Sequence, residues 1–258
     1  MNILVAGNGF IGRNLVEALR EEHTVKTLDR DKATFEQDIT ENFSIEDEFD
    51  VVFHTVGLAP GMHSAKKYRK VHVEGTRNLL KAVETEKFVY ISALGADKVD
   101  HSYFRTKKEA EDLVKNLSKN YTVFRPSTVF GRGNKLLEMI GKASRTRFFP
   151  DFSTEMQPIH IEDFTELLTR SVEDFDGETL EVAGPEEMSL GELAKRIYAS
   201  RGRKCYRVPF VESFASLGLR ISPLPGLFSS ENLELLNQRN TVDFNDAEEI
   251  LGELKQIK

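Results

Sequence analysis

The sequence predicts an α/β protein with a doubly wound parallel sheet and a smaller C-terminal lobe. Three observations predict this fold. Short apolar runs alternate with amphipathic segments of helical length through the first half of the chain. A glycine-rich turn joins the first apolar run to the first helical segment, and the second apolar run ends in an acidic residue. A chain of 258 residues can form a large core and a lobe, which we place at 1–130 and 131–258, with the lobe interwoven with the core.

The turn after the first strand, residues 3–6, has the pattern G-x-G-x-x-G. Its first glycine permits a tight turn, its second lets the backbone approach a diphosphate, and its third lets helix and strand pack closely. The diphosphate then lies at the helix N-terminus. A second strand over 25–28 ends at Asp29, where the acid that binds a ribose in a dinucleotide site belongs. We therefore expect a Rossmann-type dinucleotide site, formed first by Gly7, Asn8, Gly9, Phe10, Ile11 and Gly12.

A phosphate-binding P-loop is a competing interpretation, because Gly7 and Gly12 also have its outer spacing. That loop next needs a lysine and a hydroxyl residue, and Arg13 and Asn14 stand there instead. NTP hydrolysis is therefore disfavoured. A glycine turn without a ligand is the other alternative, but the strand, the helix and the acid together favour dinucleotide binding.

The later elements continue the alternation of strands and helices. Residues 50–56 form a nearly continuous apolar run, as expected for a parallel strand that is buried on both faces. Such alternation favours right-handed crossovers and a ligand crevice at the carboxyl ends of the strands. The remaining elements are expected as a helix over 66–84, a strand over 88–92, a helix over 103–117 and a strand over 122–124.

Composition excludes several classes of protein. The net charge of -7 argues against a general nucleic-acid surface. Cys205 is the single cysteine, which excludes an intrachain disulfide or a cysteine zinc site and suits a reducing compartment. The six histidines have no metal-ligand spacing, so no metal site is expected. With no basic-then-apolar leader and no apolar run of membrane-spanning length, we expect a cytoplasmic protein without an integral membrane segment.

Four further segments carry a family resemblance. They include the pattern R-P-x-x-x-[YF]-G, and they span residues 70–80, 124–131, 158–163 and 181–185. Together with the glycine turn, these segments resemble the extended short-chain dehydrogenases/reductases of the NAD-dependent epimerase/dehydratase family. The short length and the final segment, 229–251, are most similar to an atypical branch that contains the nucleotide-binding accessory subunit of respiratory complex I.

The resemblance implies a catalytic tyrosine and lysine, and Tyr103 and Lys107 match them at a spacing that puts both side chains on one helical face. In the implied mechanism Lys107 anchors the nicotinamide ribose and lowers the pKa of Tyr103, which transfers a proton while the cofactor transfers hydride. Ser92 matches the serine that steadies the substrate carbonyl. A surface helix with a solvated lysine is the alternative interpretation.

Two departures from the family pattern bear on catalysis rather than on cofactor binding. Ala93 and Leu94 follow Ser92 where serines commonly continue, and the loop from Ser92 to Tyr103 is short. His72 stands where the family usually has an asparagine. We favour a helix histidine that is satisfied by a backbone partner, because neutral imidazole can both donate and accept.

NAD is the expected cofactor, because Asp29 can accept both ribose hydroxyls and would repel a 2′-phosphate. NADP stays open, since Arg13 or Arg30 could pair with that phosphate. Asp38 resembles the family's adenine-side acid, although it could also be an ordinary turn acid. The rest of the expected cofactor site is Ile39, Thr55, Val56, Gly57, Lys107 and Pro126.

The C-terminal half is expected to bind the substrate. An apolar stretch over 208–228 is interpreted as a lid over the crevice, with a membrane-surface or partner-docking helix as the alternative. Several cations could accept an anionic or nucleotide-sugar substrate, or form a solvated surface. They are Arg132, Lys135, Arg145, Arg147, Arg203 and Arg207.

The leading functional hypothesis is an NAD(P)-dependent oxidoreductase, epimerase or dehydratase that acts on a small polar substrate, sugar nucleotides included. The alternative is a non-catalytic NAD(P)-binding protein with a structural, sensing or complex-assembly role. A homodimer through the helices over 66–84 and 103–117, a monomer, and a protein partner on the 208–228 stretch all remain open.

Overall fold

The computed structural model describes residues 1–151, 155–209 and 239–257. Its main sheet has seven parallel strands in the order β11-β6-β5-β4-β1-β2-β3, which confirms the predicted doubly wound fold. The strands are β1 (Asn2–Ala6), β2 (Thr24–Asp29), β3 (Phe35–Glu36), β4 (Glu48–His54), β5 (Glu84–Ile91), β6 (Tyr121–Pro126) and β11 (Glu178–Val182).

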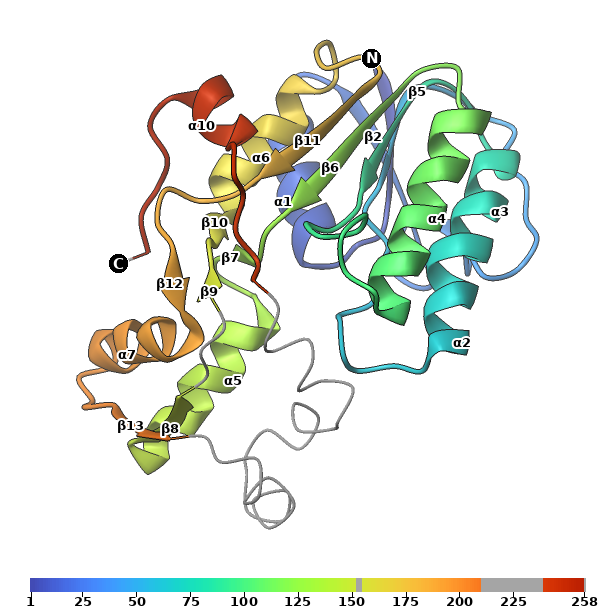
Figure 1. Ribbon diagram of the computed structural model, residues 1–258. Helices are drawn as coiled ribbons and strands as arrows, with labels where there is room; N and C mark the ends of the chain where they lie inside the picture. The colour runs from blue at the N-terminus through green and yellow to red at the C-terminus, as the bar shows by residue number, and fades with distance from the viewer. Residues whose placement is uncertain (152–154, 210–238, 258) are drawn as a thin grey trace.

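Helices cover both faces of this sheet (Figure 1). Alternate residues of β1 divide between the two cores, because successive side chains of a strand point to opposite faces. Ile3 and Val5 pack toward α1 and α6, and Leu4 and Ala6 pack toward α3 and α4. The covering helices are α1 (Phe10–Leu19), α3 (Gly75–Ala82), α4 (Ser102–Leu117), α6 (Ile161–Arg170) and the short α10 (Asp246–Leu251).

The helix predicted over 66–84 is divided into three parts. α2 (Ala65–Tyr68) continues through the π-helical turn η1 (Arg69–Glu74) into α3. The chain is already extended at Val83, and β5 begins at Glu84 rather than at the predicted residue 88. The reason is the ladder with β4, in which Glu84 pairs with Glu48. These backbone hydrogen bonds outweigh the local apolar pattern.

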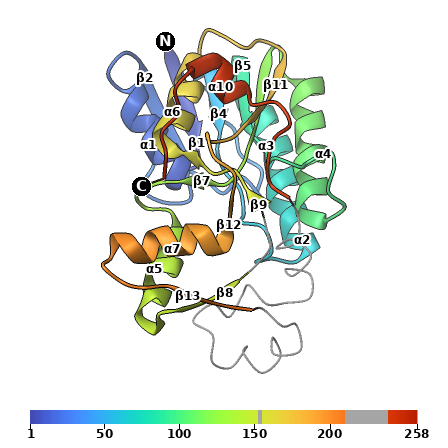
Figure 2. The same cartoon turned by 60° about the vertical axis from the view of Figure 1, so that its left-hand side comes forward.

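The C-terminal lobe lies beyond one end of the sheet (Figure 2). Its core packs Ile140, Phe149, Leu193 and Tyr198 together. It contains α5 (Lys135–Ala143), η2 (Ser144–Thr146), α7 (Leu190–Ser200) and three strand pairs, which are β7 (Val129–Phe130) with β10 (Ile159–His160), β9 (Glu155–Met156) with β12 (Met188–Ser189), and β8 (Phe148–Asp151) with β13 (Tyr206–Pro209).

Three elements of the C-terminal half belong to the main sheet layers rather than to the lobe. β11 pairs with β6, α6 packs against α1, and α10 contacts both α6 and β11. Of the apolar stretch over 208–228, residues 210–228 lie outside the described part of the chain. No helix among the described residues is long and apolar enough to cross a membrane. The same residues contain no group of three or more His, Cys, Asp or Glu side chains that could hold a metal ion.

Candidate functional site

The glycine turn between β1 and α1 has the conformation that its sequence predicts. Gly7 has φ +106°, and a Cβ there would lie 2.6 Å from the Thr55 hydroxyl oxygen. A Cβ on Gly12 would overlap the carbonyl oxygen of Gly7. Both positions therefore require glycine. A Cβ on Gly9 would meet nothing within 4 Å, so the space beside the N-terminus of α1 is open to a ligand.

Asp29 lies at the carboxyl end of β2, beside this turn. One carboxylate oxygen accepts a hydrogen bond from the backbone N–H of Asn8 at 2.5 Å, and the other accepts from the N–H of Arg30 at 2.7 Å. The acid that the sequence assigned to the ribose therefore also holds the turn against β2.

Cations line an open pocket next to the glycine turn. Arg13 Nε donates to the carbonyl of Gly9 at 3.3 Å, and Arg13 lines this pocket with Asn8, Glu17, Arg20 and Lys32. The structure thus places Arg13 beside the glycine turn. No sequence motif indicates Arg20 or Lys32, although Lys32 is three residues after Asp29.

Thr55 follows β4 and joins the end of this strand to the glycine turn. Its hydroxyl lies 3.0 Å from the carbonyl oxygens of both Ala6 and Gly7. Val56 and Gly57 follow directly, at the carboxyl end of β4. Thr55 therefore places the predicted cofactor loop against the glycine turn.

On the predicted adenine side, Asp38 accepts a hydrogen bond from the backbone N–H of Thr40 at 2.9 Å, and this bond lowers its carboxyl pKa. Ile39 is buried, and its side chain fills the space beside Gly75, where a Cβ would lie 2.7 Å from Ile39 Cδ1. Asn78 donates to the Ile39 carbonyl at 2.9 Å. These contacts attach the loop after β3 to α3.

Lys107 is buried on α4, with 4% of its surface exposed. Its Nζ donates to the carbonyl of Ile91 at 2.8 Å and lies 5.0 Å from the ring centroid of Tyr90. A Cβ on Gly57 would be only 3.2 Å from this Nζ. Burial lowers the pKa of Lys107 to about 8. The alternative of a solvated surface lysine is therefore wrong.

Tyr103 lies one helical turn before Lys107 and is also buried, at 7% exposure. Its ring packs edge-on against Tyr68 and His72, with centroids 5.5 and 5.4 Å away. Burial, and secondarily the neighbouring Tyr68, raise the pKa of Tyr103 well above its usual value. This shift is opposite to the lowering that the family resemblance implies, so the phenol is protonated near neutral pH.

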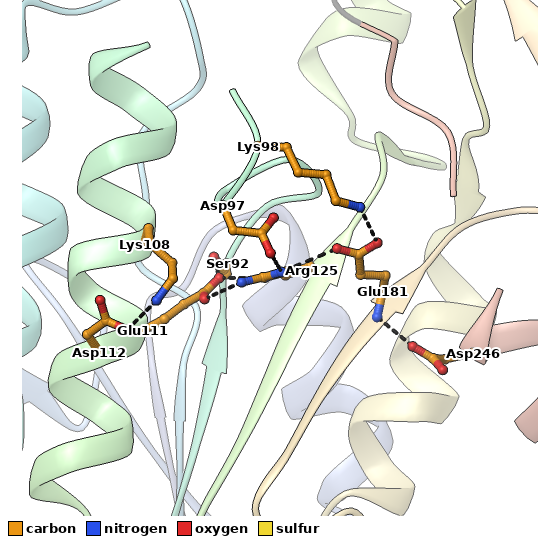
Figure 3. Close-up of polar contacts among 9 residues, drawn as sticks. All are labelled: Ser92, Asp97, Lys98, Lys108, Glu111, Asp112, Arg125, Glu181 and Asp246. Carbon is orange, nitrogen blue, oxygen red and sulfur yellow. Dashed lines mark hydrogen bonds and ion pairs between the residues drawn. The ribbon is translucent and has the colours of Figure 1, made fainter. Parts of the chain in front are cut away.

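Ser92 directs its hydroxyl toward α4. Ser92 Oγ donates to Glu111 Oε1 at 2.5 Å, and Arg125 contacts both oxygens of the same carboxylate through Nε at 2.9 Å and Nη2 at 2.8 Å. Arg125 Nη1 reaches Asp97 at 2.5 Å and Glu181 at 3.3 Å (Figure 3). One arginine therefore joins α4, β11 and the loop after β5 around the end of the sheet.

The sequence analysis missed Glu111, Asp97 and Glu181. Glu111 had a local signal, since it lies four residues after Lys107 on the same helical face. Asp97 and Glu181 had no local sequence signal for their ion pairs, because only the packing of the sheet brings them into contact with Arg125. Pro126 follows Arg125 in β6, and its carbonyl accepts from the N–H of Leu94 at 3.0 Å.

His72 connects the loop after β4 to α4. Its Nε2 accepts from the backbone N–H of Leu58 at 3.2 Å, and its Nδ1 lies 2.9 Å from the Thr106 hydroxyl. Burial lowers the pKa of His72 to about 2, so the ring is neutral. The interpretation of a histidine satisfied by a backbone partner is confirmed.

Residues 3–183 match the profile of the NAD dependent epimerase/dehydratase family, and this match covers more than half of the chain. The chain belongs to this family. The family resemblance predicted from the sequence is therefore confirmed.

Two curated relatives in the family have different roles. The mitochondrial NADH-ubiquinone oxidoreductase 40 kDa subunit of Neurospora crassa is 25% identical in an alignment of 171 residues that covers 63% of this chain and 45% of the relative. The N-acetyl-alpha-D-glucosaminyl-diphospho-ditrans,octacis-undecaprenol 4-epimerase of Escherichia coli O157:H7 is 25% identical in an alignment of 166 residues that covers 52% of this chain and 50% of the relative. The first matches the predicted branch. The chain spans about half the length of the curated relatives it matches.

Solved structures share the fold. MoeE5 in complex with UDP-glucuronic acid and NAD has a TM-score of 0.76 and 19% identity, and the match covers 100% of this chain and 95% of MoeE5. The UDP-glucose 4-epimerase of Thermotoga maritima with UDP-glucose has a TM-score of 0.67 and 20% identity, covering 81% and 85%.

The predicted substrate-side cations are distributed over the C-terminal half of this family member. Arg132 is exposed in the loop after β7. Arg145, Arg147, Arg203 and Arg207 are exposed in or beside η2, β8 and β13 of the lobe. Lys135 begins α5, and its side chain lies outside the described part of the structure.

Proposed function

We propose that the protein binds NAD(P) across the glycine turn and acts as an oxidoreductase, epimerase or dehydratase on a small polar substrate. The observation that carries this proposal is the buried pair of Tyr103 and Lys107, one turn apart on α4. Lys107 lies at the carboxyl end of β5 and next to Gly57 after β4, where an open α/β sheet binds its ligands.

The residues of the turn suit a dinucleotide. The open space at Gly9 can admit a diphosphate to the backbone N–H groups at the start of α1. Asp29 can accept ribose hydroxyls, and Lys107 can contact the second ribose beside Gly57. When bound, the cofactor supplies hydride transfer. MoeE5, whose structure is similar, is solved with NAD and a UDP-sugar, which makes sugar nucleotides the first substrates to test.

In this proposal Tyr103 holds and moves a proton at its phenolic oxygen, and the cationic Lys107 favours the phenolate. Ser92 cannot donate to a substrate carbonyl while its proton is donated to Glu111. We therefore propose that Ser92 supports the site by holding the end of β5 against α4, and does not itself polarise the substrate.

A second function is favoured by two observations. The hydroxyl of Ser92 is engaged by Glu111, and burial raises rather than lowers the pKa of Tyr103. A protein that binds NAD(P) without turnover, in a structural, sensing or assembly role, requires neither group to react. The similarity to complex I subunits adds weight to this alternative.

Calorimetric titration of NAD, NADH, NADP and NADPH tests both functions, followed by turnover of a panel of UDP- and dTDP-sugars. Under the catalytic proposal, Tyr103→Phe lowers kcat at least ~100-fold with cofactor affinity retained. Tyr121→Phe, at the far end of β6, serves as the matched control. Cofactor binding without turnover of any sugar nucleotide would favour the second function. Both functions would be overturned if none of the four cofactors bound. They would also be overturned if Gly9→Trp bound a cofactor as tightly as the unsubstituted protein does.

A further inference from the structure

One face of the small two-stranded sheet in the lobe is apolar and exposed. In the parallel pair of β8 and β13, Tyr206 lies opposite Phe148 and Val208 opposite Pro150. Phe148, Tyr206 and Val208 are 58%, 49% and 40% exposed, and the two rings lie 5.8 Å apart. The intervening Phe149 is buried in the lobe core, on the other face. Clusters of exposed large apolar side chains commonly mark binding surfaces.

Cations flank this apolar face in the sequence, although β8 itself ends in an acid, Asp151. Segments 144–150 and 201–208 contain no Asp or Glu, although the chain as a whole carries -7. Within the described part of the chain, Arg145, Arg147 and Arg203 form no ion pair, and neither does Lys204. The exposed cations of the two segments are Arg145, Arg147, Arg201, Arg203, Lys204 and Arg207.

We propose that this surface docks on an anionic phospholipid membrane. We call it the basic ribbon, made up of Arg145, Arg147, Phe148, Arg203, Lys204, Tyr206 and Val208. The apolar side chains would enter the boundary between headgroups and acyl chains, where tyrosine is favoured, and the cations would pair with lipid phosphates. The proposal is independent of any NAD(P) chemistry.

The shape and the charge of the ribbon favour a membrane over other anionic partners. Figures 1 and 2 place β8 and β13 at the end of the lobe that is farthest from the seven-stranded sheet. This position separates the ribbon from the seven-stranded sheet. Three apolar side chains are too few for the core of a protein interface of ~800 Å² on each partner. A nucleic-acid duplex would pair with the cations, but its bases are stacked inside the helix and would not contact Phe148 or Val208.

Co-sedimentation of the full chain with vesicles tests the proposal. We expect binding to phosphatidylcholine vesicles that contain phosphatidylglycerol, and none to pure phosphatidylcholine. Arg203→Glu/Lys204→Glu should weaken binding at least about tenfold, and Phe148→Ser/Tyr206→Ser should also weaken it about tenfold. Arg77→Glu/Lys81→Glu, on exposed positions of α3, makes the same change of charge and should alter binding less than about twofold.

A fluorescence measurement separates insertion from surface attraction. The chain has no tryptophan, so Phe148→Trp introduces a single reporter at the ribbon. Its emission should shift to the blue with anionic vesicles and be quenched by brominated acyl chains. Absence of binding to anionic vesicles would overturn the proposal. The proposal would also fail if Arg77→Glu/Lys81→Glu weakened vesicle binding as much as Arg203→Glu/Lys204→Glu does. Binding without a shift of the Trp emission, or tighter binding to duplex DNA or polyglutamate, would do so as well.

Discussion

Ser92 donates a 2.5 Å hydrogen bond to Glu111, a carboxylate that is fully buried on α4. The carbonyl of the preceding residue, Ile91, accepts from Lys107 on the same helix. The end of β5 is therefore attached to α4 by two polar contacts. The Ser92 hydroxyl, which the family resemblance assigns to substrate binding, therefore stabilises the fold in this structure.

Replacing Ser92 with alanine should reduce stability more than ligand binding. We expect the free energy of unfolding to fall by ~1–3 kcal/mol, because a hydrogen bond to a buried charged group is lost. The affinity for NADH should stay within about twofold, since Ser92 lies on the Glu111 side of the strand end. Urea denaturation and calorimetry measure the two quantities. Unchanged stability with a large loss of turnover would restore a direct role of Ser92 at the substrate.

Arg125 should be among the most sensitive positions of the fold. Arg125→Met leaves the carboxylate of Glu111 buried without its cation, and we expect a loss of ~3–5 kcal/mol of stability. The double variant Arg125→Met/Glu111→Leu should regain part of this loss, because the buried Glu111 carboxylate that lost its cation is then absent. Arg69→Met, which breaks an exposed ion pair with Glu109, is the control and should cost at most ~1 kcal/mol. Equal stabilities of the single and double variants would contradict this account.

Lys107 should make stability depend on alkaline pH. Its pKa is about 8 in the folded protein because of burial, against a usual 10.5. Between these values the unfolded chain binds more protons than the folded one, so the free energy of unfolding should rise as pH increases from 8 to 10.5. Lys107→Met should remove this rise and raise stability at pH 7 by up to ~3 kcal/mol.

The measurement is a series of urea transitions between pH 7 and 10.5, with Lys81→Met on the exposed face of α3 as the control. If the free energy of unfolding depends on pH in the same way for Lys107→Met, for the control and for the unsubstituted protein, Lys107 is not the buried cation that the structure indicates. Optical signals other than tyrosine absorbance should be used, because tyrosines ionise in this range.

Asp29 should set the preference for NAD over NADP. Its carboxylate accepts from the N–H of Asn8, and Arg13 and Lys32 line a pocket with the same Asn8. Asp29→Ala should lower the ratio of NADH to NADPH affinity at least about tenfold, since repulsion of the phosphate is removed and the cations remain. Asp31→Ala, two residues later and exposed, is the matched control. An unchanged ratio, measured by calorimetry, would place the discrimination elsewhere.

The sequence by itself determined the strand, glycine turn and helix of the nucleotide site, the acid at Asp29 and the spacing of Tyr103 and Lys107. These features depend on residues close together in the chain, where backbone geometry and side-chain periodicity are local properties. Only the tertiary structure decided that Glu111 accepts a hydrogen bond from Ser92, that the backbone N–H of Leu58 satisfies His72, and that burial raises the pKa of Tyr103. It also added β11 to the sheet and exposed the basic ribbon. Partners and burial of this kind arise between segments distant in sequence, so no local pattern specifies them.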